Sequence, residues 1–430
     1  MNKSQALFER AVKSLPGGIN SNSRARNPYP LYFERGEGAF VYDVDGNEYI
    51  DMVLGNGAIF FGHGYKPFEE KYQEYLKLAP GLTTGFETEL SVRLAEEFLK
   101  IVPADKVRFT NTGTEATIHV MQMARAHTGK NDFALIEGAY NGWVDAVNIS
   151  TFPAMSQVGD INCPTPVPGY GGLDKNLVES AVIIPFNNLE ITEKLISKNQ
   201  DRLAALIIEP IMIDVGYIEP TKAYLEGLRA ICDKYGVLLV FDELLTGFRV
   251  PNGSCMKWFG VKPDLACFGK AIANGHILAA VAGTEELMET VASRGLTGFV
   301  GTFNGHVYSM APGLAALELM ADGSAFDELE KNSQFLIYEF EKLTKKHNVE
   351  AFMCGRGGHL HWCFSSKVDD YRTAASGNNE NYAKFTDAML EQNIYVIPRP
   401  LSHHAISLCH DQPVLDRIVA AMDNALQKLG

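Results

Sequence analysis

The chain of 430 residues contains no run of about twenty apolar residues, which is the length that a membrane-spanning helix needs. Its beginning, MNKSQALFERAVKSLPGG, lacks the continuous apolar stretch of a secretory signal and has the pattern of a charged amphipathic helix. We therefore expect a protein that neither crosses a membrane nor is secreted.

Cysteine pairs and basic charge are also scarce. The seven cysteines are scattered, odd in number and never spaced as C-x-x-C, which favours reduced thiols in a cytoplasmic protein over a disulfide framework. Lysine and arginine number 38 against 52 aspartates and glutamates, which gives a net charge of −14. This acidic balance argues against nucleic acid or an anionic membrane as a partner, but it is compatible with local sites for small anions.

Sequence motifs for nucleotides and metals are absent: there is no G-x-x-x-x-G-K-[ST], no H-E-x-x-H and no EF-hand loop. His359 and His361 would share one face of a strand, but no third ligand follows at a suitable spacing. His403 and His404 would point apart on a strand, and we interpret them as structural or pocket-lining residues. We predict no metal site.

The middle of the sequence alternates between strands and helices. Residues 203–210 (LAALIIEP) and 237–243 (VLLVFDE) have the short apolar runs of buried strands. Between them, residues 221–236 show helical spacing of apolar side chains and end in glycine. A strand, a helix and a strand in this order predict an α/β fold with a parallel sheet, in which ligands bind at the carboxyl ends of strands. Asp242 and Glu243 stand at such an end.

A second ligand-facing turn is expected where the strand VRFT (107–110) meets the following helix. The turn, Asn111-Thr112-Gly113-Thr114, would present backbone N–H groups and hydroxyls to an anion, most often a phosphate. An ordinary helix N-cap, with Glu115 near the helix start, explains the same residues equally well.

Lys270 lies in the stretch CFGKAIANG, among glycines and small apolar residues. Most lysines are solvated surface charges, but one that is desolvated becomes a nucleophile. A helix start for a phosphate, a carboxylate for a ring nitrogen and a lysine for a Schiff base are together what pyridoxal phosphate needs.

In the order PGGINSNSRA, VYDVDGNEYIDMVLGNGAIFFGHG, NTGTEA, EGAYNGW, FDELLTGFR, CFGKAIANG and GTFNGH, the chain resembles the class III aminotransferases over nearly its whole length. Within this family of pyridoxal-phosphate enzymes it is most similar to the glutamate-1-semialdehyde aminomutase and β-amino-acid aminotransferase branch. The resemblance implies fold type I, with a large cofactor domain at 51–310, a small α+β domain at 311–430, and residues 1–50 joining the small domain.

The resemblance also implies roles for individual residues. Lys270 would hold the cofactor as an aldimine and shuttle a proton through a quinonoid, Asp242 would pair with the pyridine nitrogen, and Tyr140 would stack on the ring. Thr302 would reach the phosphate of a neighbouring subunit, which implies a homodimer. The residues expected to contact the cofactor are Thr112, Gly113, Thr114, Tyr140, Glu209, Asp214, Asp242, Leu244, Lys270 and Thr302.

Three arginines are candidates for binding an acidic substrate. Arg24 matches the position that grips the substrate carboxylate in the aminomutases, with Arg26 close by, and an arginine fork suits a carboxylate or a phosphonate. A surface arginine in a polar turn is the alternative for Arg24. Arg399 resembles the arginine that receives the acceptor's carboxylate in β-amino-acid aminotransferases, and it would equally serve another anionic group.

Three positions depart from the aminomutase pattern. Asn56 replaces a tryptophan, Asp214 an asparagine near the cofactor's phenolic oxygen, and Ser402 a glutamate. We therefore expect transamination of a small amine that carries an acidic group, with an oxo-acid as acceptor. The alternatives are a lyase that eliminates from a phosphorylated or phosphonated amino alcohol, an aminomutase and, least favoured, a cofactor-binding protein without activity.

Overall fold

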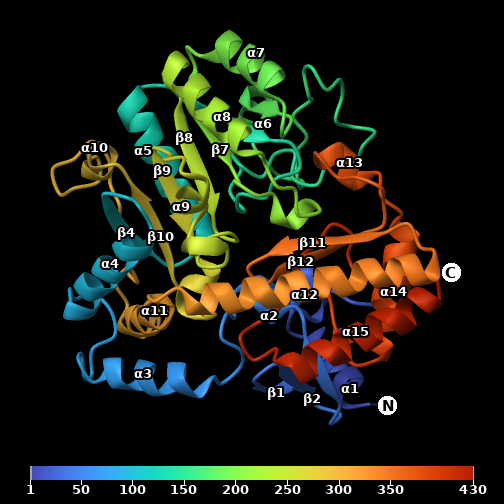
Figure 1. Ribbon diagram of the computed structural model, residues 1–430. Helices are drawn as coiled ribbons and strands as arrows, with labels where there is room; N and C mark the ends of the chain where they lie inside the picture. The colour runs from blue at the N-terminus through green and yellow to red at the C-terminus, as the bar shows by residue number, and fades with distance from the viewer. Residues whose placement is uncertain (1, 430) are drawn as a thin grey trace.

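A seven-stranded sheet forms the centre of the larger part of the molecule (Figure 1). The computed structural model describes residues 2–429. Along the sheet the strands are β4 (Lys106–Thr110), β10 (Ala279–Gly283), β9 (Leu265–Phe268), β8 (Leu238–Glu243), β7 (Leu203–Ile208), β5 (Asp132–Ile136) and β6 (Val182–Ile184). The pairs from β9 to β6 are parallel and only β10 runs against its two neighbours, so the predicted α/β fold with a mostly parallel sheet is confirmed.

Helices cover both faces of this sheet. The helices of this part are α3 (Lys66–Leu76), α4 (Glu89–Ile101), α5 (Gly113–Thr128), α6 (Lys175–Ser180), α7 (Leu189–Asn199), α8 (Lys222–Tyr235), α9 (Cys255–Phe259), α10 (Glu285–Glu289) and α11 (Val307–Met320). Strand β7 is buried on both sides: Leu206 and Ile208 join the apolar cluster beneath α7 and α8, and Ile207 joins the cluster beneath α5. The predicted strand–helix–strand unit is thus β7, α8 and β8, and α8 ends at Gly236 in the left-handed conformation.

Two smaller sheets complete the fold. The meander β1 (Phe33–Glu37), β2 (Phe40–Asp43) and β3 (Glu48–Asp51) continues into β13 (Ile394–Tyr395), which pairs with β3 in parallel. The other sheet consists of β11 (Phe352–Arg356), β12 (His359–Cys363) and β14 (His404–Ala405). The remaining α-helices are α1 (Lys3–Ala11), α2 (Leu54–Gly57), α12 (Ser324–His347), α13 (Tyr371–Ala375), α14 (Asn379–Glu391) and α15 (Gln412–Gln427).

The long helix α12 runs alongside β11 and packs against α15 (Figure 1). Because β3 and β13 share a sheet, the two ends of the chain are joined in one layer. The division of the chain into domains at residues 50 and 310 stays a prediction.

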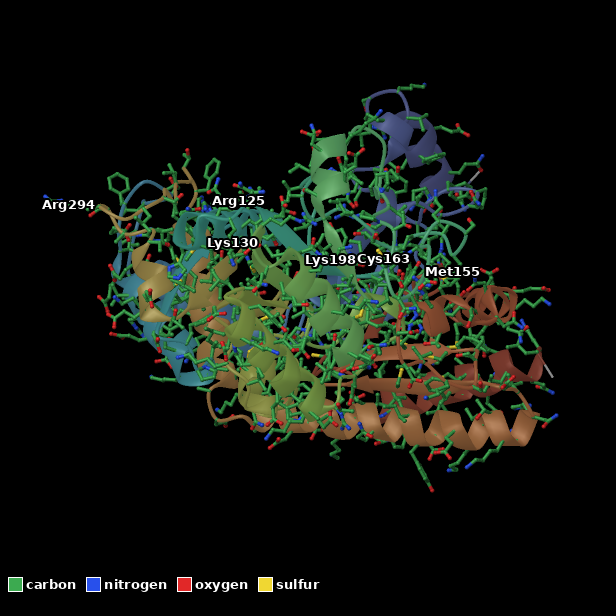
Figure 2. All side chains as sticks on the ribbon, turned by 90° about the horizontal axis from the view of Figure 1, so that it is seen from above. Arg125, Lys130, Met155, Cys163, Lys198 and Arg294 are labelled. Atoms are coloured by element: carbon green, nitrogen blue, oxygen red, sulfur yellow. The ribbon has the colours of Figure 1, made fainter. Side chains whose placement is uncertain are left out.

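A long segment without helices or strands, residues 151–172, follows β5, as the proline and glycine content predicted. Its exposed Met155 and Cys163 mark its course in Figure 2, whereas Val158 and Val167 are buried and hold it to the core. Over residues 2–429, no helix has both the length and the apolar character that crossing a bilayer requires.

Candidate active site

Lys270 and Asp242 lie at the same edge of the central sheet. Strand β8 ends just after Asp242, whose Cα pairs with that of Cys267 on β9. Two residues beyond β9, Lys270 starts the 3₁₀ turn Lys270–Ala273 with a φ of 47°. A side chain in this left-handed region is uncommon and strained, and such strain is concentrated at functional sites.

The Asp242 carboxylate is held at both oxygens. The Asn141 side-chain amide donates to Oδ2 at 2.9 Å, and the backbone N–H of Leu244 donates to Oδ1 at 3.0 Å. Burial raises the pKa of Asp242, while these two donors and the charge of Lys270 oppose the rise by stabilising the ionised form. A buried carboxylate fixed in this way is a strong partner for a protonated ring nitrogen.

The start of helix α5 combines an ordinary N-cap with free amides for an anion, which the sequence left as alternatives. The Thr112 hydroxyl caps the helix by accepting from the Glu115 N–H at 3.2 Å. The first amides of the helix, at Gly113 and Thr114, have no acceptor within the helix, because the opening turn of any α-helix leaves its N–H groups unpaired. The cap therefore does not compete with an anion for these amides.

Leu244 joins the helix start to the lysine turn. A Cβ placed on Gly113 would lie 2.6 Å from the Leu244 Cδ1, and one on Gly269 would lie 2.8 Å from its Cδ2. Both backbones therefore approach the leucine more closely than a larger residue would allow. This packing brings the opening of α5 and the residue before Lys270 to two sides of one buried side chain.

Tyr140 is attached to the same cluster through its backbone. Its N–H donates to Oε1 of Glu209 at 3.0 Å, and the next residue, Asn141, donates to Asp242. Burial and the charges of Asp242 and Asp214 raise the pKa of Glu209 well above its ordinary value.

Asp214 is paired with His403, a residue 189 positions away. The His403 Nδ1 lies 2.6 Å from the Asp214 Oδ1, and the ring is only 2% exposed. Although burial opposes the effect, the histidine lowers the pKa of Asp214 below its usual range, with contributions from Lys270 and Arg399. His403 was interpreted as structural or pocket-lining, and no sequence signal identified its partner. The anchoring role of Asn141 was likewise missed, although it lies in the motif EGAYNGW.

The three arginines differ in their surroundings. Arg24 is exposed at the end of a short turn. The Arg26 guanidinium donates from Nη2 to the Val396 carbonyl at 2.9 Å and lies over the Tyr395 ring, so it ties the N-terminal segment to β13.

Arg399 is held at the surface by two contacts. Its Nε donates to the Ser402 hydroxyl at 2.9 Å, and its guanidinium lies 5.0 Å from the Phe152 ring centre. The serine that replaces the aminomutase glutamate therefore holds Arg399.

Thr302 and Asn56 lie outside the contacts around Leu244. Thr302 is exposed, its carbonyl accepts from the Thr84 hydroxyl, and it lines a cavity of about 620 Å³ together with Asn111. Asn56 is exposed with a φ of 57°, a conformation that asparagine tolerates well. Among residues 2–429, no group of three or more His, Cys, Asp or Glu side chains is placed to hold a metal.

These residues fit pyridoxal phosphate by the chemistry of their donors and acceptors. The helix start offers amides and hydroxyls for a phosphate, Asp242 offers a fixed carboxylate for the ring nitrogen, and Lys270 offers an amine. The buried Leu244 offers an apolar face for the ring.

Comparisons with known proteins agree with this chemistry. The sequence model of the family described as aminotransferase class-III matches residues 21–410. The glutamate-1-semialdehyde 2,1-aminomutase of Methanosphaera stadtmanae is 37% identical over 431 residues, which cover 100% of this chain and 99% of that protein.

Two solved structures are similar over nearly the whole chain. An omega-transaminase from Sphaerobacter thermophilus has a TM-score of 0.92 and 31% identity, with 99% of this chain and 98% of that chain covered. A β-phenylalanine aminotransferase from Variovorax paradoxus has a TM-score of 0.86 and 26% identity, with 98% and 92% covered.

Proposed function

Because the chain belongs to the class III aminotransferase family and is therefore a pyridoxal-phosphate-dependent enzyme of fold type I, we propose that it transaminates a small amine carrying an acidic group. The observation that carries the proposal is the position of Asp242, buried and held at both oxygens, at the same sheet edge as Lys270. A neutral or mobile carboxylate at this place would not keep a ring nitrogen protonated.

The residues that would hold the cofactor follow from the site. Thr112, Gly113 and Thr114 would bind its phosphate, and Tyr140 and Leu244 would pack on the two faces of its ring. When bound, the cofactor supplies an electron sink for the carbon that bears the substrate nitrogen. The Lys270 amine would remove the proton from that carbon and return it elsewhere on the same face, acting as base and then acid.

Glu209 and Asp214 would complete the cofactor site. Glu209 orients the segment that carries Tyr140 through the Tyr140 N–H. Asp214 would face the phenolic oxygen of the cofactor, and its pairing with His403 offsets the negative charge that it carries there.

The acidic group of the substrate would be bound by Arg24 or Arg399. Arg24 is exposed, and Arg399 contacts a neutral hydroxyl and an aromatic face, so within residues 2–429 neither has an ion pair with a carboxylate to break. An arginine with this freedom can accept first the acidic group of the amine and then that of an oxo-acid. Arg26, already bonded to Val396, would support the site from behind.

We also propose a cytoplasmic homodimer in which Thr302 reaches the partner's phosphate site. Four large apolar side chains in or beside the 297–303 loop are between 58% and 87% exposed, namely Phe86, Leu296, Val300 and Phe303. A second copy would cover them, since exposed apolar patches mark interfaces. The seven cysteines are free, which agrees with a reducing compartment.

A half-reaction tests the reaction type. The cofactor-loaded enzyme is mixed with one amine at a time, from a panel with carboxylate, phosphonate or phosphate groups, and without any oxo-acid. Transamination converts the cofactor to its amino form once per site and yields one equivalent of oxo product. Lys270→Ala, which lacks the proton-transferring amine, is the control and should show no conversion within the same time.

Other outcomes identify other reactions. Continuous release of ammonia without an acceptor would make the protein an eliminating lyase and contradict the proposal. An isomerised amine with no net oxo product would make it an aminomutase, the activity in the name of the 37% identical relative.

A further inference from the structure

Two cysteines and a histidine share one face of the sheet formed by β11, β12 and β14. The strand register places Cys354 opposite His361, and Cys363 lies two residues farther along β12 on the same face. The Cys354 and Cys363 sulfurs are 3.8 Å apart, and both are free thiols.

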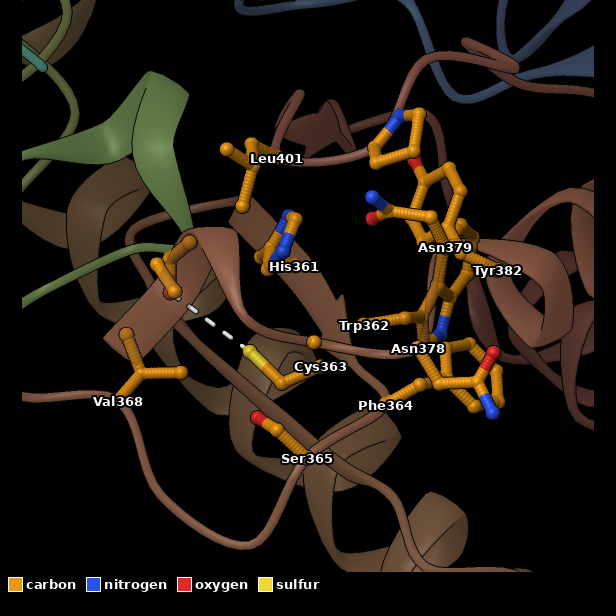
Figure 3. A pocket seen from close by; sticks show the side chains of 14 residues that line it. His361, Trp362, Cys363, Phe364, Ser365, Val368, Asn378, Asn379, Tyr382 and Leu401 are labelled. Atoms are coloured by element: carbon orange, nitrogen blue, oxygen red, sulfur yellow. Dashed lines mark hydrogen bonds between the residues drawn. The ribbon is translucent and has the colours of Figure 1, made fainter. Parts of the chain in front are cut away.

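One member of this pair, Cys363, lines a small pocket (Figure 3). His361 and Cys363 line it, with Tyr382 and Leu401 on other sides. Its volume is about 20 Å³, and a site for one water needs roughly 10–15 Å³. The space next to Cys363 thus has the size of one to two waters, which is the size class of hydrogen peroxide and far below that of a bulky disulfide such as oxidised glutathione.

The two thiols are chemically unequal. The hydrogen bond with Cys354 and the nearby His361 lower the pKa of Cys363 to about 6, although burial opposes the change. The same contact, together with burial, raises the pKa of Cys354 well above its ordinary value. Since thiolates are the nucleophiles, Cys363 is the sulfur that reacts first and Cys354 is placed to resolve the product.

We propose that Cys354 and Cys363 form a peroxide-sensitive thiol pair that closes reversibly into a disulfide. The Cys363 thiolate attacks one oxygen of hydrogen peroxide, the O–O bond breaks, and a sulfenic acid and hydroxide are formed, the latter taking up a proton to give water. The Cys354 sulfur then attacks the sulfenyl sulfur and loses its proton, and a second water leaves as the S–S bond forms. In total, two thiols are oxidised by two electrons and one peroxide is reduced to two waters.

The Gly216 carbonyl connects this pair to the proposed cofactor site. Its oxygen lies 3.4 Å from the Cys354 sulfur and 3.7 Å from the Cys363 sulfur, so it accepts a hydrogen bond from a thiol of this pair that holds its proton. A disulfide brings the sulfurs to about 2 Å and leaves no S–H in the pair, so this carbonyl loses its thiol donor. Gly216 follows directly after the turn Ile213–Val215, which carries Asp214. An effect of oxidation on activity by way of Asp214 rests on the proposed function, but the disulfide itself does not.

The test uses the full-length, cofactor-loaded enzyme with hydrogen peroxide at one to ten equivalents per site. We expect the loss of two of the seven thiols, a mass decrease of two hydrogens, a Cys354–Cys363 cross-linked peptide, and reversal by dithiothreitol. Oxidised glutathione at the same equivalents should form the Cys354–Cys363 disulfide at least tenfold more slowly than hydrogen peroxide does, because the pocket excludes it. The Cys409→Ser variant, which removes a half-buried thiol elsewhere, is the matched control and should behave as the parent does.

Single variants separate the two roles. Cys354→Ser should leave a sulfenic acid on Cys363 that dimedone traps, whereas Cys363→Ser should leave Cys354 unoxidised under the same conditions. Absence of the cross-linked peptide in the parent, or oxidation of Cys354 in Cys363→Ser at the parental rate, would overturn the proposal. These readouts are mass measurements, so they stand even if the enzyme proves not to be a transaminase.

Discussion

Replacement of Gly57 by alanine should destabilise the protein by about 3–7 kcal/mol, because a methyl group there has no room. Gly57 has a φ of +79°, and its added Cβ would lie 2.2 Å from Cε1 of the His359 ring. That ring is buried and is fixed by its Nε2, 3.1 Å from the Leu245 carbonyl. The ring must therefore move and break this hydrogen bond.

The magnitude has four contributions. A left-handed alanine costs about 1–2 kcal/mol, and the stiffer unfolded chain returns about 0.4–1 kcal/mol. Overpacking adds about 1–3 kcal/mol, and the lost buried hydrogen bond adds about 1–3 kcal/mol. Gly81 is the matched control, since its φ is +76° and nothing lies within 4 Å of its added Cβ. Gly81→Ala should therefore lose only the difference between the first two contributions, about 0.5–1 kcal/mol.

Urea unfolding of both variants at equal cofactor load gives the comparison. A double variant, Gly57→Ala with His359→Ala, removes the ring and should recover at least about 2 kcal/mol relative to the sum of the single changes. Equal midpoints for Gly57→Ala and Gly81→Ala, or strict additivity in the double variant, would refute the reasoning about the fixed ring.

Three further predictions concern the site. Asp242→Asn should keep the fold and bind the cofactor, but its kcat should fall at least about 100-fold, because the ring nitrogen loses its charged partner. Steady-state kinetics measure this loss. Activity within a few-fold of the parent would place the partner of the ring nitrogen elsewhere. Arg24→Ala should lower kcat/KM for an acidic amine by about 10- to 150-fold, because KM rises. Arg26→Ala should instead lower the urea concentration at which half of the protein is unfolded. An unchanged KM would mark Arg24 as a surface residue. In His403→Phe, the half-buried Asp214 loses its hydrogen-bonded partner, so its pKa rises and its ionised form becomes costly. The variant's Asp214 takes up a proton as the pH falls from 7 to about 4, whereas the parent's Asp214, with its lowered pKa, stays ionised and keeps its contribution to stability. The difference in unfolding free energy between parent and variant should therefore become smaller over this pH range. A constant difference would contradict the pairing.

The parts of the fold that the sequence predicted are those that local patterns encode. The apolar runs of β7 and β8 and the helical spacing of α8 lie within forty-one consecutive residues, and the structure has all three elements in that order. Asp242 was singled out because it ends the apolar run VLLVFDE, and Lys270 because it lies among glycines and small apolar residues in CFGKAIANG.

The contacts that were missed join residues far apart in the chain. His403 reaches Asp214 over 189 residues, and Asn141 reaches Asp242 over 101. Such pairs depend on how the elements pack and not on periodicity. The approach of Cys354 and Cys363 was also unforeseen, because it requires the register of β11 against β12.

The pairing of β13 with β3 delays completion of the N-terminal sheet while the chain is being synthesised. Tyr395 pairs with Asp51, so the meander near the N-terminus cannot complete its sheet until 344 further residues have been made. At about 5–20 residues per second, this takes roughly 17–70 seconds. Throughout that interval the edge of β3 is unpaired, and an unpaired strand edge is a template for association with other chains. We therefore expect the nascent chain to be prone to association at its N-terminal end during this interval, and truncation just before β13 should make this vulnerability permanent.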